Sequence, residues 1–377
     1  MKMKINHEIR SIYIHIPFCL RKCPYCPFYS RAFSEDEADK YLSSLEKEIQ
    51  WWKRSGHEIG ILNTLYIGGG TPSILTDHQW SRLIGLLENS FRFSPDCEVS
   101  VEANPESVTQ NRLFKWDNWR VNRISLGVQS LQDNELKWLE RPYNRKDVTD
   151  ALDLIRDHRF LLSCDLMFSL GNQPLRSLYS TLNELLNFWH PEHISTYQLT
   201  LEKGTPWGEN PPENMDDGYA GYRFIQWYLS QKGYEQYEIS SFARYNNYCR
   251  HNLAYWDQQN VIGLGPSAWG YINGLRYSNS PDYESYVIRS GLSESTIAYS
   301  EFLDNEKRAR EAVILSLRTA WGFSISDFSS IFGQSTVRDI LNDLNDVPGE
   351  YLVYDKNNVY LSPKGMRVGN SIWEKII

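Results

Sequence analysis

The 377-residue sequence lacks the features that define several classes of protein. No apolar stretch approaches the ~20 residues that cross a bilayer, and residues 1–8 lack the apolar core of a secretory signal. Basic residues are not in excess, because the formal net charge is −8. Phosphate contacts need a basic surface, so we expect no nucleic-acid partner. These absences predict a cytoplasmic protein with no transmembrane segment.

Cysteine is scarce, but three of the six cysteines lie within eight residues, as Cys19-x-x-x-Cys23-x-x-Cys26. Soft thiolates on one short loop predict an iron–sulfur or zinc site. A structural zinc site needs four ligands, and no fourth Cys or His follows at ligand spacing. Three thiolates on a [4Fe–4S] cluster leave one iron open for an exchangeable ligand. The pattern therefore favours a cluster that binds a small molecule, and a disulfide with a spare thiol is the alternative.

Short apolar runs alternate with amphipathic stretches through the first two thirds of the chain, which is typical of βα units around a parallel sheet. The expected strands are 11–18, 63–68, 97–103, 121–128, 161–168 and 193–201. The expected helices are 35–55, 76–92, 132–139, 144–158 and 174–188. Ser34, with Glu37 three residues on, and Thr76 are predicted N-caps. Six such units predict an α/β fold with a complete or partial (β/α) barrel, and an open doubly wound sheet is the alternative.

The regular alternation ends near residue 205, and three domains are predicted at 1–235, 236–299 and 300–377. A helix is expected near 215–231, and 234–272 is expected to be irregular with short strands. The last domain is predicted to hold three helices and a β-hairpin, as a smaller winged-helix-like module; the ranges are 305–319, 325–331, 335–345, 351–354 and 358–361. Residues 301–377 carry nine Lys/Arg and eleven Asp/Glu, so docking or packing is expected rather than DNA binding.

Polar residues recur at the carboxyl ends of the predicted strands, where parallel α/β sheets gather function. The run Gly68-Gly-Gly-Thr-Pro-Ser73 follows the second strand, and its glycines allow the backbone to approach a ligand closely. Glu102 lies in an apolar strand, which predicts a ligand or an Arg partner. Gln129 and Asp165 end the next two strands. Each could be a structural hydrogen-bonding residue, but together they surround the same mouth as the cysteine loop.

These motifs resemble the radical S-adenosylmethionine (AdoMet) superfamily. The later segments 234–240, 251–256 and 361–365 narrow the resemblance to its branch of oxygen-independent coproporphyrinogen III oxidases and HemW-type heme chaperones. The resemblance covers nearly the whole chain. It implies a [4Fe–4S] cluster held by Cys19, Cys23 and Cys26, with AdoMet on the open iron. The positions that it implies for AdoMet contacts are Tyr13, Tyr25, Gly69, Gly70, Thr71, Glu102, Gln129, Arg141 and Asp165.

The resemblance is closer to the chaperones than to the oxidases. Phe28 stands where the oxidases have a fourth cysteine, and His251-Asn-Leu-Ala-Tyr-Trp256 matches a motif associated with heme binding. His251 is thus a candidate axial heme ligand, and a structural role in an irregular segment is the alternative. The expected function is transfer of heme to an unidentified acceptor protein, which could itself be membrane-bound. Oxidative decarboxylation of coproporphyrinogen III is the enzymatic alternative. Pro27, Ser169 and Trp269 depart from the residues common in the chaperones.

Overall fold

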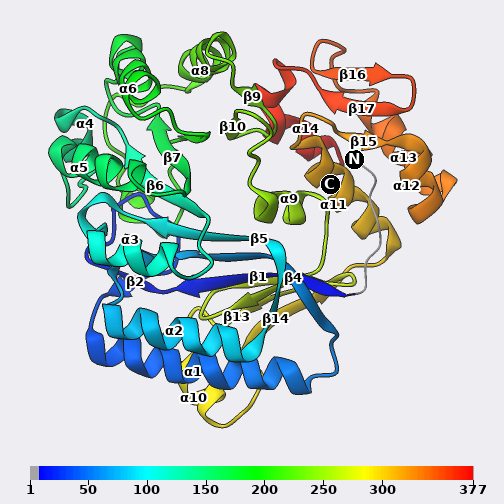
Figure 1. Cartoon of the computed structure of the whole chain (residues 1–377). Coiled ribbons are helices and arrows are strands. Elements are labelled where there is room, and N and C mark those ends of the chain that lie inside the picture. Colours follow the sequence, from blue (N-terminus) through cyan, green and yellow to red (C-terminus); the bar gives the residue numbers. More distant parts are fainter. Residues whose placement is uncertain (1–7, 377) are drawn as a thin grey trace.

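The fold is dominated by a single curved sheet of twelve strands (Figure 1). The structure is a computed structural model and describes residues 8–376. Six parallel strands follow one another in chain order: β1 (Ile9–Ile16), β4 (Ile59–Gly69), β5 (Arg92–Ala103), β6 (Arg123–Gln129), β7 (Leu161–Phe168) and β8 (His193–Gln198). The sheet order begins and ends at different strands, β14 and β9, so the barrel is open. The α/β partial barrel predicted from the sequence is confirmed.

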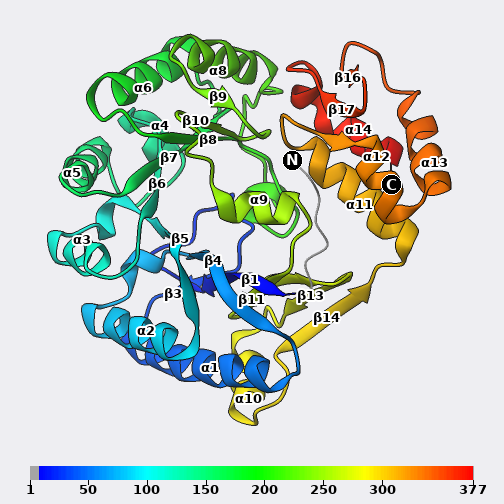
Figure 2. The ribbon, with the colours of Figure 1, turned by 45° about the vertical axis from the view of Figure 1, so that its right-hand side comes forward.

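Helices cover the outer face of this sheet (Figures 1 and 2). They are α1 (Glu35–Arg54), α2 (Asp77–Ser90), α3 (Gln110–Asp117), α4 (Asp133–Trp138), α5 (Arg145–Arg156), α6 (Leu175–Phe188) and α8 (Tyr219–Gln231). Strand β1 shows why the two faces differ. Ile12, Ile14 and Ile16 are fully buried, whereas Tyr13, between them, is partly exposed. Alternate side chains of a strand point to opposite faces, so the helix-covered face is apolar and closed and the inner face is polar and accessible.

Both predicted N-cap residues precede a helix, and one of them makes side-chain cap hydrogen bonds. Thr76 Oγ1 accepts from the backbone N–H of Gln79, and the Gln79 side chain accepts in return from Thr76 N, as in a capping box. Ser34 is the N-cap residue of α1, as predicted, but its side chain makes no cap hydrogen bond within the described residues. Glu37 instead accepts from Arg31 Nη2 at 2.9 Å. The three acidic residues of the first turn still suit the positive end of the α1 dipole.

The segment expected to be irregular is more regular than its sequence indicates. It adds strands to both edges of the sheet, namely β9 (Glu235–Gln236), β10 (Ser241–Ala243), β11 (Val261–Leu264), β12 (Trp269–Ile272), β13 (Leu275–Asn279) and β14 (Ile297–Phe302). It also holds α9 (Arg250–Trp256) and α10 (Tyr283–Gly291). Strand β11 pairs in parallel with β1. These strands have two to six residues each, too few for an apolar period, so sheet pairing rather than local pattern decides their conformation.

The carboxyl-terminal residues form a second core beside the barrel (Figure 2). Its helices are α11 (Asn305–Leu317), α12 (Ile325–Phe332), α13 (Gln334–Leu344) and α14 (Gly369–Ile376), and its sheet has the order β15 (Phe323–Ser324), β17 (Asn358–Leu361), β16 (Leu352–Asp355). The three predicted helices and the hairpin are therefore present. The exact domain boundaries 1–235, 236–299 and 300–377 stay a prediction.

Candidate cluster and AdoMet site

The three clustered cysteines lie on the loop that follows β1, at the carboxyl end of the parallel strands. Cys19 ends the short strand β2 (Phe18–Cys19), which pairs with β3 (Arg31–Ala32). Cys26 N donates to Cys23 O at 3.2 Å, which closes a turn between these two cysteines. Burial raises the pKa of the Cys19 and Cys26 thiols. Their thiolates therefore need a neighbouring positive group or a metal.

Among residues 8–376 every cysteine is a free thiol, and no three His, Cys, Asp or Glu side chains converge on one ion-binding point. A tetrahedral zinc site requires such convergence, because all its ligands bind the same ion. In a cubane each thiolate binds a different iron, so its three sulfurs need not converge. The arrangement fits a cluster better than a single ion.

The glycine run after β4 is pressed against the cysteine loop. Gly70 N donates to Ile16 O at 2.8 Å, and Thr71 N donates to Phe18 O at 2.7 Å. A Cβ atom on Gly70 would lie 2.5 Å from Phe18 O, so only glycine fits there. Thr71 Oγ1 donates to Cys19 Sγ at 3.6 Å. The run thus joins the second strand to the first cysteine.

Two carboxylates lie on the inner face of the sheet. Glu102 accepts from Tyr66 OH and Gly69 N, each at 2.9 Å, and Asp165 Oδ2 accepts from Ser125 Oγ at 2.8 Å. Burial raises the pKa of Glu102 to about 7 and the pKa of Asp165 to about 6. The predicted Arg partner of Glu102 is not observed; a phenol and a backbone amide take its place. Two ionisable groups with raised pKa values on one accessible face indicate a ligand-binding site.

Arg141 connects the cysteine loop with the ends of β5 and β6. Its Nη1 lies 3.2 Å from Cys23 Sγ and 3.3 Å from Tyr25 OH. Its Nη2 donates to Asn104 Oδ1 at 2.9 Å, and its Nε donates to Tyr143 OH at 2.7 Å. The guanidinium is therefore held by four side chains from three parts of the chain.

Gly127 in β6 lies close to the Arg141 side chain, and a side chain at this position would not fit. A Cβ atom there would lie 2.8 Å from Asn104 Oδ1, 2.9 Å from Gln129 Nε2 and 3.3 Å from Arg141 Nη2. Gln129 itself has a φ of 61°, at an irregularity in the β6–β7 pairing. Two donors, Gln129 Nε2 and Arg141 Nη2, and one acceptor, Asn104 Oδ1, lie so close to Gly127 that no larger residue fits there.

These residues fit a [4Fe–4S] cluster with AdoMet. The loop offers three thiols and no fourth cysteine nearby, as a cluster with an open iron requires. The inner face beside it offers carboxylates for hydroxyl or ammonium groups, and Arg141 offers a fork of donors for a carboxylate. The structure brings together all the sequence-predicted residues of this mouth: Tyr13, Cys19, Cys23, Tyr25, Cys26, Gly69, Gly70, Thr71, Glu102, Gln129, Arg141 and Asp165.

His251 lies apart from the cysteines, on α9. This helix crosses the amino-terminal end of the parallel strands, in the centre of the view in Figure 2. The His251 side chain is 1% exposed, and burial lowers its pKa to about 3, so the imidazole is neutral. Its Nδ1 lies 2.9 Å from Thr64 Oγ1.

Sequence reasoning missed three residues of the site: Tyr66, Asn104 and Ser125. Tyr66 lies two positions before Gly68, and Asn104 lies two positions after Glu102. Residues two positions apart in a strand share a face, so each lies on the face of a residue that was predicted. Ser125 is the sheet partner of Glu102. The alternation within the strands was the available signal.

The three departures from the chaperone pattern lie in different places. Pro27 is exposed on the cysteine loop. Ser169 has a φ of 63° and its hydroxyl donates to Asp216. Trp269 is 50% exposed at the start of β12, with its ring 5.7 Å from that of Tyr299.

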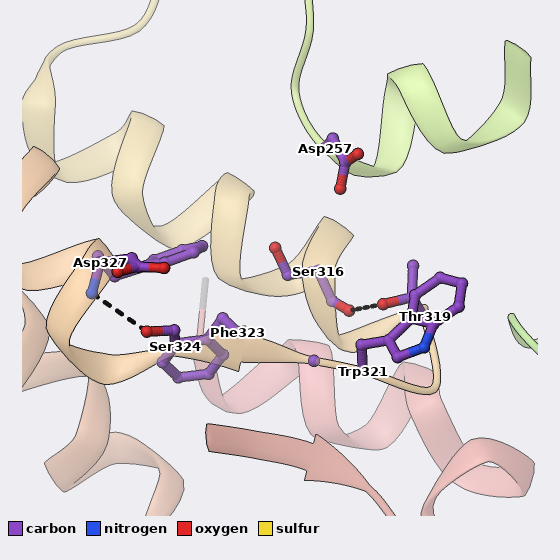
Figure 3. Close-up of a pocket in the computed structure, with 9 residues that line it drawn as sticks. Asp257, Ser316, Thr319, Trp321, Phe323, Ser324 and Asp327 are labelled. Carbon is purple, nitrogen blue, oxygen red and sulfur yellow. Dashed lines mark hydrogen bonds between the residues drawn. The ribbon is translucent and has the colours of Figure 1, made fainter. Parts of the chain in front are cut away.

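A separate pocket lies between the end of α9 and the carboxyl-terminal core (Figure 3). Asp257 faces it from the barrel side, and Trp321, Phe323 and Asp327 line it from the other. None of the sequence-predicted site residues lines it. It marks the junction of the two cores rather than the cluster site.

The comparisons with known proteins define the class and the family of this chain. The model of the radical SAM superfamily matches residues 13–185. A solved structure of the coproporphyrinogen III oxidase HemN from Escherichia coli superposes with a TM-score of 0.84 at 22% identity, covering 97% of this chain and 89% of HemN. The fold and the cysteine loop together define a radical SAM protein, the class whose members hold a [4Fe–4S] cluster and AdoMet.

Full-length relatives narrow the assignment. "Heme chaperone HemW" of Bacillus subtilis is 32% identical over 379 residues, covering 97% of this chain and 98% of the relative. The HemW of Lactococcus lactis is 30% identical, with 97% of each chain covered. The HemW of E. coli is 35% identical over 70% of each chain. The chain belongs to the HemW family.

Proposed function

We propose that this chain binds heme and transfers it to an acceptor protein, and that it holds a [4Fe–4S] cluster with exchangeable AdoMet. The family membership carries the proposal, because relatives named heme chaperone match nearly the whole chain. Phe28, which is 64% exposed, supports it, since the oxidases that the motifs resemble have a cysteine at that position. None of the helices within residues 8–376 is both long enough and apolar enough to span a bilayer.

We propose that Cys19, Cys23 and Cys26 hold the cluster. Tyr13, Tyr25, Gly69, Gly70, Thr71, Glu102, Gln129, Arg141 and Asp165 then contact AdoMet. Bound AdoMet would supply sulfonium and, on reduction, radical chemistry. The protein's own contribution is positional: Arg141 fixes Cys23 and Tyr25, and the glycine run fixes Glu102 through Gly69 N.

Axial heme ligation by His251 stays a prediction. The side chain is buried on the inner side of the barrel, and its ring lies 6.4 Å from that of Tyr13. A heme iron that reached His251 would therefore bring the macrocycle into the space beside the proposed AdoMet contacts. Ligation at this histidine predicts competition between heme and AdoMet, whereas heme bound elsewhere predicts simultaneous binding.

One preparation can test the function. The protein is reconstituted anaerobically with iron and sulfide, and the broad absorption of a [4Fe–4S] cluster is measured. Heme is then titrated with and without AdoMet, and the heme-loaded protein is mixed with a heme-free acceptor such as an apo-cytochrome. We expect cluster absorption, stoichiometric heme binding and loss of heme to the acceptor.

The same preparation, given reductant, AdoMet and coproporphyrinogen III, separates the chaperone from the enzyme. We expect no protoporphyrinogen. Its formation would replace the chaperone proposal with the oxidase alternative. Colourless protein that binds zinc in place of iron would remove the cluster from the proposal.

A further inference from the structure

The position of His251 is fixed by a buried charge pair beneath the barrel. Glu98 and Arg123 form an ion pair at 3.2 Å, and their side chains are 6% and 2% exposed. The carboxylate of Glu98 also accepts from Arg250 N at 3.1 Å and from His251 N at 2.9 Å. Arg123 Nη2 donates to the carbonyls of Asn247 and Tyr248 at 3.0 and 2.9 Å. The first turn of α9 is thus anchored to strands β5 and β6, and the imidazole is held against the inner face.

The hydrogen bonds around the ring determine its tautomer. Thr64 Oγ1 donates to Ser11 Oγ at 2.9 Å and also lies 2.9 Å from His251 Nδ1. A hydroxyl carries one proton, so Thr64 can only accept from Nδ1–H. The neutral imidazole then has a bare lone pair on Nε2. Because the two ring nitrogens point in divergent directions, Nε2 points away from Thr64.

Nε2 is buried and has no hydrogen-bond partner among residues 8–376. Two other buried inner-face atoms share this condition, Ser100 Oγ and Asp165 Oδ1. A buried polar atom without a partner costs free energy, so each of the three is a candidate contact for a bound ligand.

Each of the three residues is linked through a neighbour to the proposed AdoMet contacts. The His251 ring stacks on Tyr66 with centroids 5.2 Å apart and planes at 25°, and Tyr66 OH donates to Glu102. Ser100 is the sheet partner of Tyr66. Asp165 is bonded to Ser125, the sheet partner of Glu102.

We propose that Nε2 of His251 accepts a hydrogen bond from a ribose hydroxyl of bound AdoMet, at the floor of the barrel. The inference rests on the AdoMet site proposed above and adds a contact from outside the six βα units. The imidazole offers an acceptor and no donor on this side, and Asp165 Oδ1 is a second acceptor. A ribose supplies two neighbouring hydroxyl donors, which suits this pair.

Two substitutions separate contact through Nε2 from a structural role through Nδ1. In His251→Gln the amide oxygen can occupy the place of Nε2 and accept a hydrogen bond. In His251→Asn the amide group can occupy the place of Nδ1 and still donate to Thr64, but nothing replaces Nε2. Both variants are reconstituted with cluster. The dissociation constant of AdoMet is measured by equilibrium dialysis, and the spectrum of the reduced cluster is recorded with and without AdoMet.

We expect His251→Asn to weaken AdoMet binding about tenfold, as for the loss of one buried hydrogen bond, and His251→Gln to weaken it less. An AdoMet analogue that lacks the contacted ribose hydroxyl should bind wild type and His251→Asn equally. Heme titrations of the three proteins should coincide. Melting temperatures identify any variant that does not fold. The result is read from which of the two variants, His251→Asn or His251→Gln, has the larger dissociation constant for AdoMet.

The outcomes distinguish this inference from the proposed function. AdoMet binding by His251→Asn equal to wild type, or weaker binding by Gln than by Asn, overturns the inference alone. Loss of heme binding with AdoMet binding unchanged also overturns it, because Nε2 would then serve the heme iron. Wild-type protein that loads a cluster but binds no AdoMet overturns both the inference and the AdoMet part of the proposed function.

Discussion

The Nη1 atom of Arg141 lies 3.2 Å from the Sγ atom of Cys23, although 118 positions separate the two residues in the chain. The same guanidinium reaches Tyr25 on the cysteine loop and Asn104 after β5. One side chain therefore aligns the cluster loop with the inner face of the sheet, and several predictions test this alignment and its surroundings.

Replacement of Arg141 by Lys should weaken AdoMet binding by about ten- to a hundredfold, because an ammonium keeps the charge but lacks the planar fork of donors. Cluster content should change little. Arg145→Lys is the matched control, since Arg145 bonds to Glu184 on the exposed surface. Isothermal titration under anaerobic conditions measures the affinities, and equal effects of the two variants would contradict the role of Arg141.

Replacement of any one of Cys19, Cys23 and Cys26 by Ala should abolish the [4Fe–4S] absorption and leave less than one iron per chain. A cubane with two protein thiolates loses a ligand that no nearby cysteine can replace. Cys97→Ala is the control, because Cys97 is buried within β5 and its thiol donates to Glu98 O at 3.7 Å. Iron and sulfide assays provide the measurement. Normal iron content in the variants would show that other residues hold the cluster.

Gly127→Ala should weaken AdoMet binding at least tenfold and leave the cluster intact, because the new methyl group would lie within 3 Å of Asn104 and Gln129 side-chain atoms. Gly85→Ala is the matched control. A Cβ atom on Gly85 in α2 would meet no heavy atom within 4 Å, so this change should stabilise the helix by about 0.5–1 kcal/mol. Both variants are compared by AdoMet titration and thermal melting, and unimpaired binding by Gly127→Ala would show that the surroundings of Gly127 are not part of the site.

AdoMet affinity should fall as the pH falls from 8 to 6, because Glu102, whose pKa is raised to about 7, loses its charge in this range. Glu102→Gln should remove the upper part of this dependence. A lower part centred near pH 6 should remain, from Asp165. Affinity measured at half-unit steps tests the profile, and an unchanged profile in the variant would exclude Glu102 from the binding equilibrium.

The same substitution should stabilise the ligand-free protein at pH 8. The folded-state pKa of Glu102 lies above the usual value of 4.5. Its contribution to stability is therefore present below pH 4.5 and is lost as the pH rises through 7. Glu102→Gln should raise the free energy of unfolding at pH 8 by on the order of 1–3 kcal/mol, and by much less at pH 5. Denaturant melts at the two pH values measure the difference, and a lower stability at pH 8 would contradict the burial cost.

The sequence predicts the parallel part of the fold well because each of its strands is long enough to show an apolar run and each is followed by a helix. The strand predicted at 161–168 has these bounds in the structure. The edge strands were not predictable in the same way. Strand β11 has four residues, one of them Gly263, and its conformation depends on pairing with β1.

The site, like the fold, has a part that the sequence predicts and a part that it does not. Residues at strand ends, such as Glu102 and Asp165, follow from strand position alone, since all parallel strands end at one edge. The place of His251 does not follow, because α9 is anchored by Glu98 and Arg123, whose pairing no local pattern reveals.

The anchoring of α9 also determines from which side AdoMet and heme can enter the site. Because that helix lies across the amino-terminal end of the parallel strands, we expect ligands to reach the inner face from the opposite rim, beside the cysteines. An acceptor protein that docked on this rim would block the route by which bound AdoMet leaves. Heme transfer and AdoMet exchange would then exclude each other in time.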